Sequence, residues 1–473
     1  MRQAKSKKRI TPIEVAIRQS GGTYTECAGV LALWHLWQEM EVADLLKEAG
    51  IHYGQEKEKA PGLSFAATIG PLVGASSDRR IAQRFGGEPS PEGIERDELL
   101  SQLVEAPFSQ RTMNRFMGKA RHDWRALHQA RVSWLQRQPG LKAEAKGVVI
   151  VDDYPTPKPY AEKMAYLSRI RDQNQNRTVP GFQMVHLYYH HPQRPDYSLY
   201  VQPWRPTSAT GETKPKPAGA VRPARPDEEQ SRLDIALAAV RDFLPLLADY
   251  GAVIFDSWYT ARWLGHALTQ LGARWIGVAE SSQKFELTQT GEYLAVPAIL
   301  ERFWQQCQSL DNSSSTLAVA IEAIIRPDRY TKVAQAVQLV LARAEGSSLD
   351  DAEPDYYLLI CNQPTWSAQK IVSFFQCRPE IEQAHRQGKQ WQGWVDFQHR
   401  RWPCLQAYLA FALLRSLLLT LLVFWQEDLA LFSVRELISH AIQSVAFLLK
   451  RATGLVVYLA RGQPAARRCL ALL

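Results

Sequence analysis

Apolar residues recur at spacings of three and four over much of the first third of the chain. The segment AGVLALWHLWQEMEVADLLKEAGI, residues 28–51, has this helical spacing. Further on, ERDELLSQLVEAPFSQRTMNRFMGKARHDW, residues 95–124, predicts a helix, a turn around Ala106 and Pro107, and a second helix capped by Ser109. We therefore expect residues 1–145 to form an all-α region.

The pattern changes at Gly147. GVVIVDDY, residues 147–154, is a short β-branched run closed by acids, which is typical of a buried strand that ends at a site. Two further strands, a helix capped by Ser231 and a second buried strand, GAVIFDSWY at residues 251–259, follow it. Strand, meander, helix and strand in this order predict an α/β domain.

Changes of pattern also divide the later part of the chain into segments. Residues 274–362 alternate like strands, and helices are expected to dominate from Ser367 to the end. The segment between Trp204 and Ser231 is rich in Pro, Gly and basic residues and predicts a mobile surface loop. The pattern thus separates residues 1–145, 146–273 with the loop at 204–231, 274–362 and 363–473.

One apolar run is long enough to raise the question of a membrane. YLAFALLRSLLLTLLVFW, residues 408–425, reaches the length of a spanning helix, but Arg415 lies in its middle, which lipid tolerates poorly. A buried helix of a large domain has the same pattern. We interpret the run as core, while a membrane protein would predict solubility that depends on detergent.

Charge and cysteine content limit the class of protein to which this chain can belong. The net charge of +8 suits an anionic partner, of which nucleic acid is the commonest. The six cysteines include no pair at CxxC spacing, so neither a zinc ribbon nor a redox pair is predicted. The basic N-terminus is followed by no apolar run of the signal-peptide type, which favours a cytoplasmic protein.

Acids stand at the ends of both buried strands. Asp152 and Asp153 close the first strand, Asp256 closes the second, and Glu382 lies on a charged helix further on. Acids at strand ends in an open α/β sheet lie where such folds place their sites, and oxygen-only ligands suit Mg2+ or Mn2+. Two ions about 3.5–4 Å apart would serve an in-line attack on phosphorus. Taken singly, Asp153 and Asp256 are also explained as turn caps.

The helix that carries Glu382 is crowded with charge. In FFQCRPEIEQAHRQGKQW, residues 374–391, offsets of four, eight and eleven place Arg378, Glu382, Arg386 and Lys389 on one face, whereas Glu380 is roughly opposite. A carboxylate held among cations suits a metal beside phosphate oxygens. A solvated face with ordinary ion pairs would give the same pattern.

The same residues resemble a known family. FFQCRPEIEQAHRQGK resembles the Y-x2-R-x3-E-x6-K signature of insertion sequence four type transposases, with Phe375 in the Tyr position. VVIVDDYPTPK is similar to the DDTxxPK box of the subgroup numbered seven hundred and one, and GAVIFDSWYT is similar to the second-aspartate box. QRTMNRF, near residue 110, is similar to part of the N-terminal domain of the family.

This resemblance implies a DDE transposase with an RNase H-like core, an all-α N-terminal DNA-binding region and a β-rich insertion domain before the catalytic glutamate. Asp152, Asp256 and Glu382 would hold Mg2+ or Mn2+, with Asp152 favoured over Asp153 because it aligns with the first acid of the box. The implied partners are terminal inverted repeats and target DNA, bound by a homodimer or a higher synaptic assembly, with no membrane. The DNA-binding candidates are Arg378, Lys389, Arg386, Lys158, Arg111, Arg115 and Trp304.

Several alternatives stay open. Residues 98–119 fit either a helix-turn-helix that presents Arg111 and Arg115 to DNA or two packed helices. In the family an aromatic residue of the insertion stacks on a flipped base, and Trp275 and Trp304 are candidates, although most such Trp residues are core. His190 and His191 are interpreted as solvated residues before a proline turn. A transposase-derived DNA-binding regulator that no longer cleaves is the alternative function.

Overall fold

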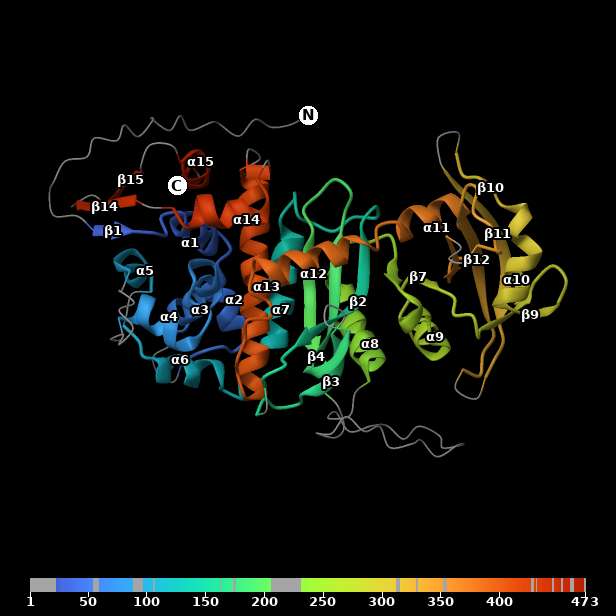
Figure 1. The fold of residues 1–473 in the computed structure, drawn as a ribbon, viewed down its shortest axis with the longest axis horizontal. Helices are drawn as coiled ribbons and strands as arrows, with labels where there is room; N and C mark the ends of the chain where they lie inside the picture. The colour runs from blue at the N-terminus through green and yellow to red at the C-terminus, as the bar shows by residue number, and fades with distance from the viewer. Residues whose placement is uncertain are drawn as a thin grey trace. The chain divides into compact units, whose positions relative to one another are not determined.

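The computed structural model describes residues 23–471, except 54–58, 88–96, 105–106, 162, 173–175, 206–230, 312–314, 329–330, 352–354, 427–428, 431, 445, 452–453 and 460–462. The chain forms two compact units, one made of residues 1–130 and 386–473 and the other of residues 131–385. Most of the segment predicted as a mobile loop, 206–230, lies outside the described residues, and so does the N-terminal stretch before Thr23. Figure 1 shows the elements of both units.

A mixed β-sheet is the framework of unit 131–385. Its central strand β2 (Val148–Pro157) pairs antiparallel with β4 (Arg177–His190) and parallel with β6 (Val253–Phe255), which pairs parallel with β7 (Trp275–Val278). The strands β3 (Ser168–Asp172) and β5 (Tyr197–Pro203) both pair with β4. Such a mixed sheet with helices is consistent with an RNase H-like domain, as the sequence predicted.

The region predicted as an insertion continues this sheet. The strand β13 (Tyr356–Cys361) pairs with β7, and the order continues through β12 (Gln335–Ala344) to β11 (Thr316–Ile325). Beyond them lie β8 (Lys284–Leu287) and β9 (Tyr293–Ala295), while β10 (Gln308–Ser309) pairs with β11. Among the described residues, residues 274–362 therefore extend one twelve-stranded sheet (Figure 1).

Several helices in this unit begin at a capping side chain or a proline. The helix α8 (Arg232–Phe243) has the capping box of Ser231 and Asp234, as Ser231 predicted. The other helical segments are η3 (Leu244–Leu246), η4 (Ser257–Tyr259), α9 (Arg262–Gln270), α10 (Val296–Phe303), η5 (Trp304–Gln306), α11 (Ala368–Phe375) and α12 (Glu380–Gln390). Pro379 precedes α12 directly, and α12 and α7 (Trp124–Arg137) both cross the boundary between the units.

The other unit is mostly helical. Its N-terminal helices are α1 (Val30–Glu39), α2 (Val42–Glu48), α3 (Lys59–Ile69), η1 (Gly70–Val73), α4 (Asp78–Ile81), η2 (Ala82–Gly86), α5 (Glu98–Leu103) and α6 (Gln110–Met117). Its C-terminal helices are α13 (Trp402–Trp425), α14 (Val434–Glu436), η7 (Leu437–Ile442) and α15 (Pro464–Leu470). Ser109 caps α6 by accepting the N–H of Thr112, as predicted.

A small sheet in the helical unit corrects one prediction. The strand β1 (Thr23–Thr25) pairs with β14 (Ala446–Arg451), which pairs with β15 (Gly454–Leu459). The N-terminal region is therefore not all-α, whereas helices dominate the C-terminal part as predicted. The local pattern misses this sheet because the partner of β1 lies more than 400 residues away, as the pairing of Thr23 with Leu448 shows.

The long apolar helix α13 lies in the core of the helical unit. It is the one described helix that is long and apolar enough to cross a membrane, but 78% of its most apolar window is buried inside the protein, so this is weak evidence for a membrane. The guanidinium of Arg415 is fully buried and donates to the carbonyl oxygens of Thr68, Ala67 and Gln392. These bonds explain the charge in the middle of an apolar run, since a buried cation needs acceptors.

Candidate active site

The register of two parallel strands brings Asp152 and Asp256 together. Val151 of β2 is paired with Phe255 of β6, so the next residue of each chain segment lies at the same edge of the sheet. Asp256 ends its strand and caps η4, where one carboxylate oxygen accepts the N–H of Trp258 at 3.0 Å. The carboxyl ends of adjacent parallel strands thus deliver both acids to one place, where α/β sheets commonly carry their sites.

The third predicted acid reaches the same place through one arginine. The guanidinium of Arg378 lies 3.5 Å from the Asp152 carboxylate, 3.6 Å from the Asp256 carboxylate and 2.9 Å from Glu382. Arg378 directly precedes Pro379, and Glu382 lies in the first turn of α12. Asp152, Asp256 and Glu382, named here the acid cluster, therefore converge on one cationic group.

Asp153 faces a different set of partners. Its carboxylate forms an ion pair with Arg232, accepts from the side-chain amide of Gln183, and accepts the hydroxyl of Tyr259 at 3.3 Å. Neighbouring residues of a strand point to opposite faces of the sheet, which separates Asp153 from Asp152. This geometry favours Asp152 as the member of the acid cluster, the residue that the sequence interpretation preferred.

Burial strongly affects the acids of this site. Burial raises the pKa of Asp152 to about 7, although Arg378 and the backbone N–H of Asp153 act in the opposite direction. Burial also raises the pKa of Asp256, again opposed by Arg378. Carboxylates that are costly to ionise without a nearby cation are well suited to bind one.

The donor set fits the metal that the sequence implied. All three side chains offer only oxygen, the ligand type that Mg2+ and Mn2+ prefer. The acid cluster already surrounds a positive charge, the guanidinium of Arg378, whose Nε is buried without a hydrogen-bond partner. Asp152, Asp256 and Glu382 are therefore the residues that would hold a divalent ion here.

A buried histidine pair joins the two elements that carry acids. His186, which is paired with Asp152 across β2 and β4, has its Nδ1 2.9 Å from Nε2 of His385 on α12 and its Nε2 3.0 Å from the hydroxyl of Ser198. Burial lowers the pKa of His186 to about 3, so the ring of His186 is neutral in this contact. The sequence interpretation treated His385 only as a companion of Glu382 and missed this contact, because the partner lies 199 residues away.

The histidines at the end of β4 are not solvated, so that prediction is wrong. His191 is 4% exposed, and the His190 side chain is 12% exposed and bound to Asp196 at 3.0 Å. The turn into β5 folds Asp196 back over the end of β4, where its second oxygen accepts the N–H of His191. A turn sequence alone cannot reveal a carboxylate that returns five residues later.

The other predicted DNA contacts are scattered. Arg386 and Lys389 continue α12 but belong to the other unit, so their position relative to the acid cluster is not defined. Arg111 and Arg115 are exposed on α6, and Lys158 directly follows β2. These positions are compatible with a DNA surface, and their role remains a prediction.

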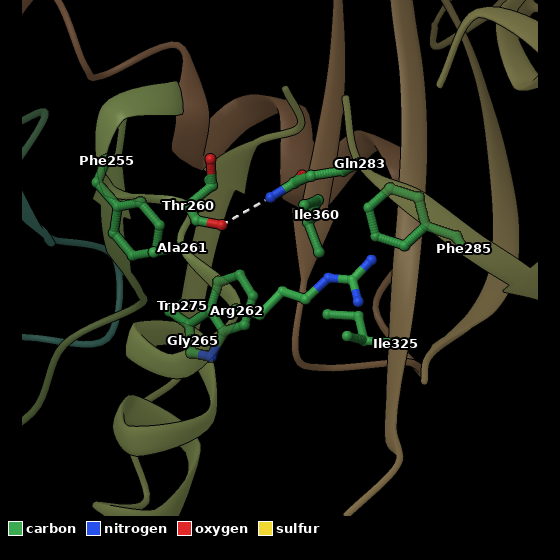
Figure 2. A pocket seen from close by; sticks show the side chains of 10 residues that line it. All are labelled: Phe255, Thr260, Ala261, Arg262, Gly265, Trp275, Gln283, Phe285, Ile325 and Ile360. Carbon is green, nitrogen blue, oxygen red and sulfur yellow. Dashed lines mark hydrogen bonds between the residues drawn. The ribbon is translucent and has the colours of Figure 1, made fainter. Parts of the chain in front are cut away.

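Neither predicted tryptophan is available to stack on a base. Trp304 is 4% exposed, with the guanidinium of Arg343 over its ring and Tyr356 against its edge. Trp275 is 2% exposed and stacks on Phe255 at 5.6 Å. Trp275 lies in the wall of a small cavity, which Figure 2 shows together with the hydrogen bond from the side-chain amide of Gln283 to the carbonyl oxygen of Thr260. The volume of this cavity is about 10 Å3, which suits about one water molecule.

An exposed aromatic residue that the sequence reading missed lies beside the acid cluster. Trp258 follows Asp256 by two residues and is 69% exposed, and the guanidinium of Arg232 lies 5.3 Å from its ring centre. Arg232 also holds Asp153, so this cation joins the exposed indole to the strand that carries Asp152. The sequence did contain a signal for this residue, because the segment DSWY places Trp258 two residues after an acid that ends a strand.

A larger cavity opens next to the acid cluster. Its volume is about 490 Å3, and its lining includes Asp256 and Arg378 together with Arg343, Tyr357 and Phe375. Phe375, which stands where the family signature has Tyr, is 7% exposed and packs edge-on against Tyr357 at 5.3 Å. Tyr357 is half exposed, so an aromatic hydroxyl is still available beside Phe375.

The fold and the site define a class: a mixed α/β protein with a carboxylate cluster at the ends of parallel strands and a cation among the carboxylates. Residues 97–291 match the family model described as DDE superfamily endonuclease. This match, which covers Asp152 and Asp256 and ends before Glu382, supports an enzyme of the nuclease type with DNA as its substrate. No curated protein matches the chain.

Proposed function

We propose that this protein is a DDE transposase of the insertion sequence four type that cuts DNA at the ends of a mobile element and joins them to a target. The observation that carries the proposal is the convergence of Asp152, Asp256 and Glu382 on Arg378. The family match to residues 97–291 supports the nuclease class independently. The fit to the subgroup numbered seven hundred and one rests on the boxes quoted from the sequence.

The acid cluster would supply the metal ligands of this reaction. Mg2+ or Mn2+, in about two copies, would activate a water or a 3′-hydroxyl and stabilise the leaving oxygen of an in-line displacement at phosphorus. Asp152 and Asp256 are held on the rigid sheet edge, and the His186–His385 bond fixes α12, and with it Glu382, against that sheet. A site on regular elements keeps the ligands in a narrow range of geometry.

Arg378 has two roles in this proposal. Without a divalent ion, its guanidinium offsets part of the negative charge of the acid cluster. With metal bound, the same side chain becomes available for a phosphate oxygen of the DNA end, for which a guanidinium is well shaped. Lys389, Arg386 and Lys158 would hold other phosphates of the same strand, and Arg111 and Arg115 would contact the terminal repeat.

The remaining features of the proposal follow from this chemistry. Joining two element ends requires a synaptic assembly, so we propose a homodimer or a larger complex on double-stranded DNA. The reaction would take place in the cytoplasm, on nucleoid DNA.

A cleavage assay tests the proposal. The DNA that flanks the gene supplies the candidate inverted repeats, and a labelled duplex that contains one repeat is incubated with the protein and Mg2+ or Mn2+. A transposase nicks the duplex at the repeat boundary and, with target DNA present, yields joined products. Binding to the repeat without any metal-dependent cutting would instead identify a DNA-binding regulator derived from a transposase.

A further inference from the structure

A second group of metal-ligating side chains lies away from the acid cluster. One ligand atom each from His190, Asp196 and Glu380 falls within 4.8 Å of the others. His190 ends β4, Asp196 lies in the turn before β5, and Glu380 begins α12. Glu380 is two residues from Glu382, which places the two carboxylates on nearly opposite sides of the helix.

We propose that His190, Asp196 and Glu380 form a binding site for a divalent cation of the zinc class. An imidazole and two carboxylates form a mixed nitrogen and oxygen set, which Zn2+ accepts and Mg2+ does not favour. Three protein ligands leave the fourth position of a tetrahedral zinc shell to a water molecule.

The arrangement goes beyond an ordinary ion pair. The bond of 3.0 Å between His190 and Asp196 would be satisfied by these two residues alone. Glu380, on a separate segment, nevertheless has a carboxylate oxygen within 4.8 Å of both ligand atoms. The side chains of His190 and Asp196 are 12% and 27% exposed, so the site is shielded on the sheet side and open to entry past Glu380.

Such an ion would join the sheet to the start of the helix that carries Glu382. The second oxygen of Asp196 already accepts the backbone N–H of His191 at 3.0 Å, which orients this ligand as supporting hydrogen bonds do in metal sites. The proposed ion is distinct from the Mg2+ or Mn2+ of the acid cluster. It does not depend on the proposed function, because it rests only on these three side chains.

Zinc binding to the full chain tests the proposal without an activity assay. A background variant, Asp256→Asn with Glu382→Gln, removes the acid cluster as a competing site. Equilibrium dialysis of the chelator-treated protein against Zn2+ should give one bound ion per chain in this background. Adding Glu380→Gln should weaken binding by at least tenfold, and His190→Ala should abolish it.

Glu380→Gln and Glu382→Gln form a matched pair on one helix. Glu380 is exposed, so its replacement leaves packing intact, and circular dichroism checks that the His190 variant is folded. Zinc binding that is absent from the background, or unchanged by both Glu380→Gln and His190→Ala, would overturn the proposal.

Discussion

The guanidinium of Arg378 lies 3.5 Å from the Asp152 carboxylate and holds two further acids, Asp256 and Glu382, around the same charge. Burial and mutual repulsion both raise the free energy of the ionised carboxylates, and a cation in this position lowers it again. A divalent ion entering the site would have to compete with it.

Replacing Arg378 separates the two roles proposed for it. In Arg378→Ala the acid cluster loses its internal cation, so we expect Mn2+ to bind more tightly than in the wild type. Affinity for DNA should fall, and the slope of log affinity against log salt should decrease by about one, because one phosphate contact is lost. Calorimetry with Mn2+ and salt-dependent DNA binding measure the two effects. Weaker Mn2+ binding in this variant would show that Arg378 supports the metal site.

The two neighbouring aspartates of β2 should behave differently. Asp152→Asn is expected to remove Mn2+ binding, because Asp152 belongs to the acid cluster. Asp153→Asn should keep Mn2+ binding and lower the free energy of unfolding by about 1 kcal/mol, since it breaks the ion pair with Arg232. Calorimetry and denaturant unfolding of both variants provide the comparison. Mn2+ binding that is lost in Asp153→Asn and kept in Asp152→Asn would assign the metal to Asp153.

The raised pKa of Asp152 predicts how stability changes with pH. The folded protein favours the protonated carboxyl up to about pH 7, whereas the unfolded chain loses this proton near 3.8. The metal-free protein therefore loses stability as pH rises between these values, by at most about 4 kcal/mol from this group. Thermal unfolding in a chelator should show Asp152→Asn gaining stability over the wild type from pH 5 to pH 8. A difference that stays constant with pH would contradict this account of the site.

Trp258 is the aromatic residue that we expect to contact DNA near the acids. It is 69% exposed and two residues from Asp256, so Trp258→Ala should weaken DNA binding roughly tenfold, the usual effect of losing one stacked base. Trp391, which is 39% exposed and lies under Arg435, provides a matched control for loss of an exposed indole. Equal losses in Trp258→Ala and Trp391→Ala would remove the special role of Trp258.

The sequence predicted the acid cluster because both the strands and the acids have local signals. VVIVDD and VIFD are short apolar runs closed by an acid, and in the structure Val151 and Phe255 are paired neighbours. The choice between Asp152 and Asp153 depends on which side chain meets Arg378, and spacing alone cannot decide it. Trp304 shows what spacing cannot predict, because Arg343 and Tyr356, which bury its ring, lie on strands 39 and 52 residues further along the chain.

Long-range pairing accounts for most of what the sequence missed. β1 pairs with β14, and His186 meets His385, through contacts that no local pattern encodes. The extension of one sheet through residues 274–362 also depends on the pairing of β13 with β7, two strands that are 80 residues apart. Periodicity predicted these strands but not their partners.

The central claim is that Asp152, Asp256 and Glu382 form one metal-dependent DNA-cleaving site. The most direct test is strand cleavage of a labelled inverted-repeat duplex in Mg2+ by the wild type, Asp256→Ala, Glu382→Gln and the control Asp153→Asn. We predict cutting by the wild type and by Asp153→Asn, and a loss of at least a thousandfold in the other two, with DNA binding retained. Cleavage that survives both Asp256→Ala and Glu382→Gln would contradict the claim.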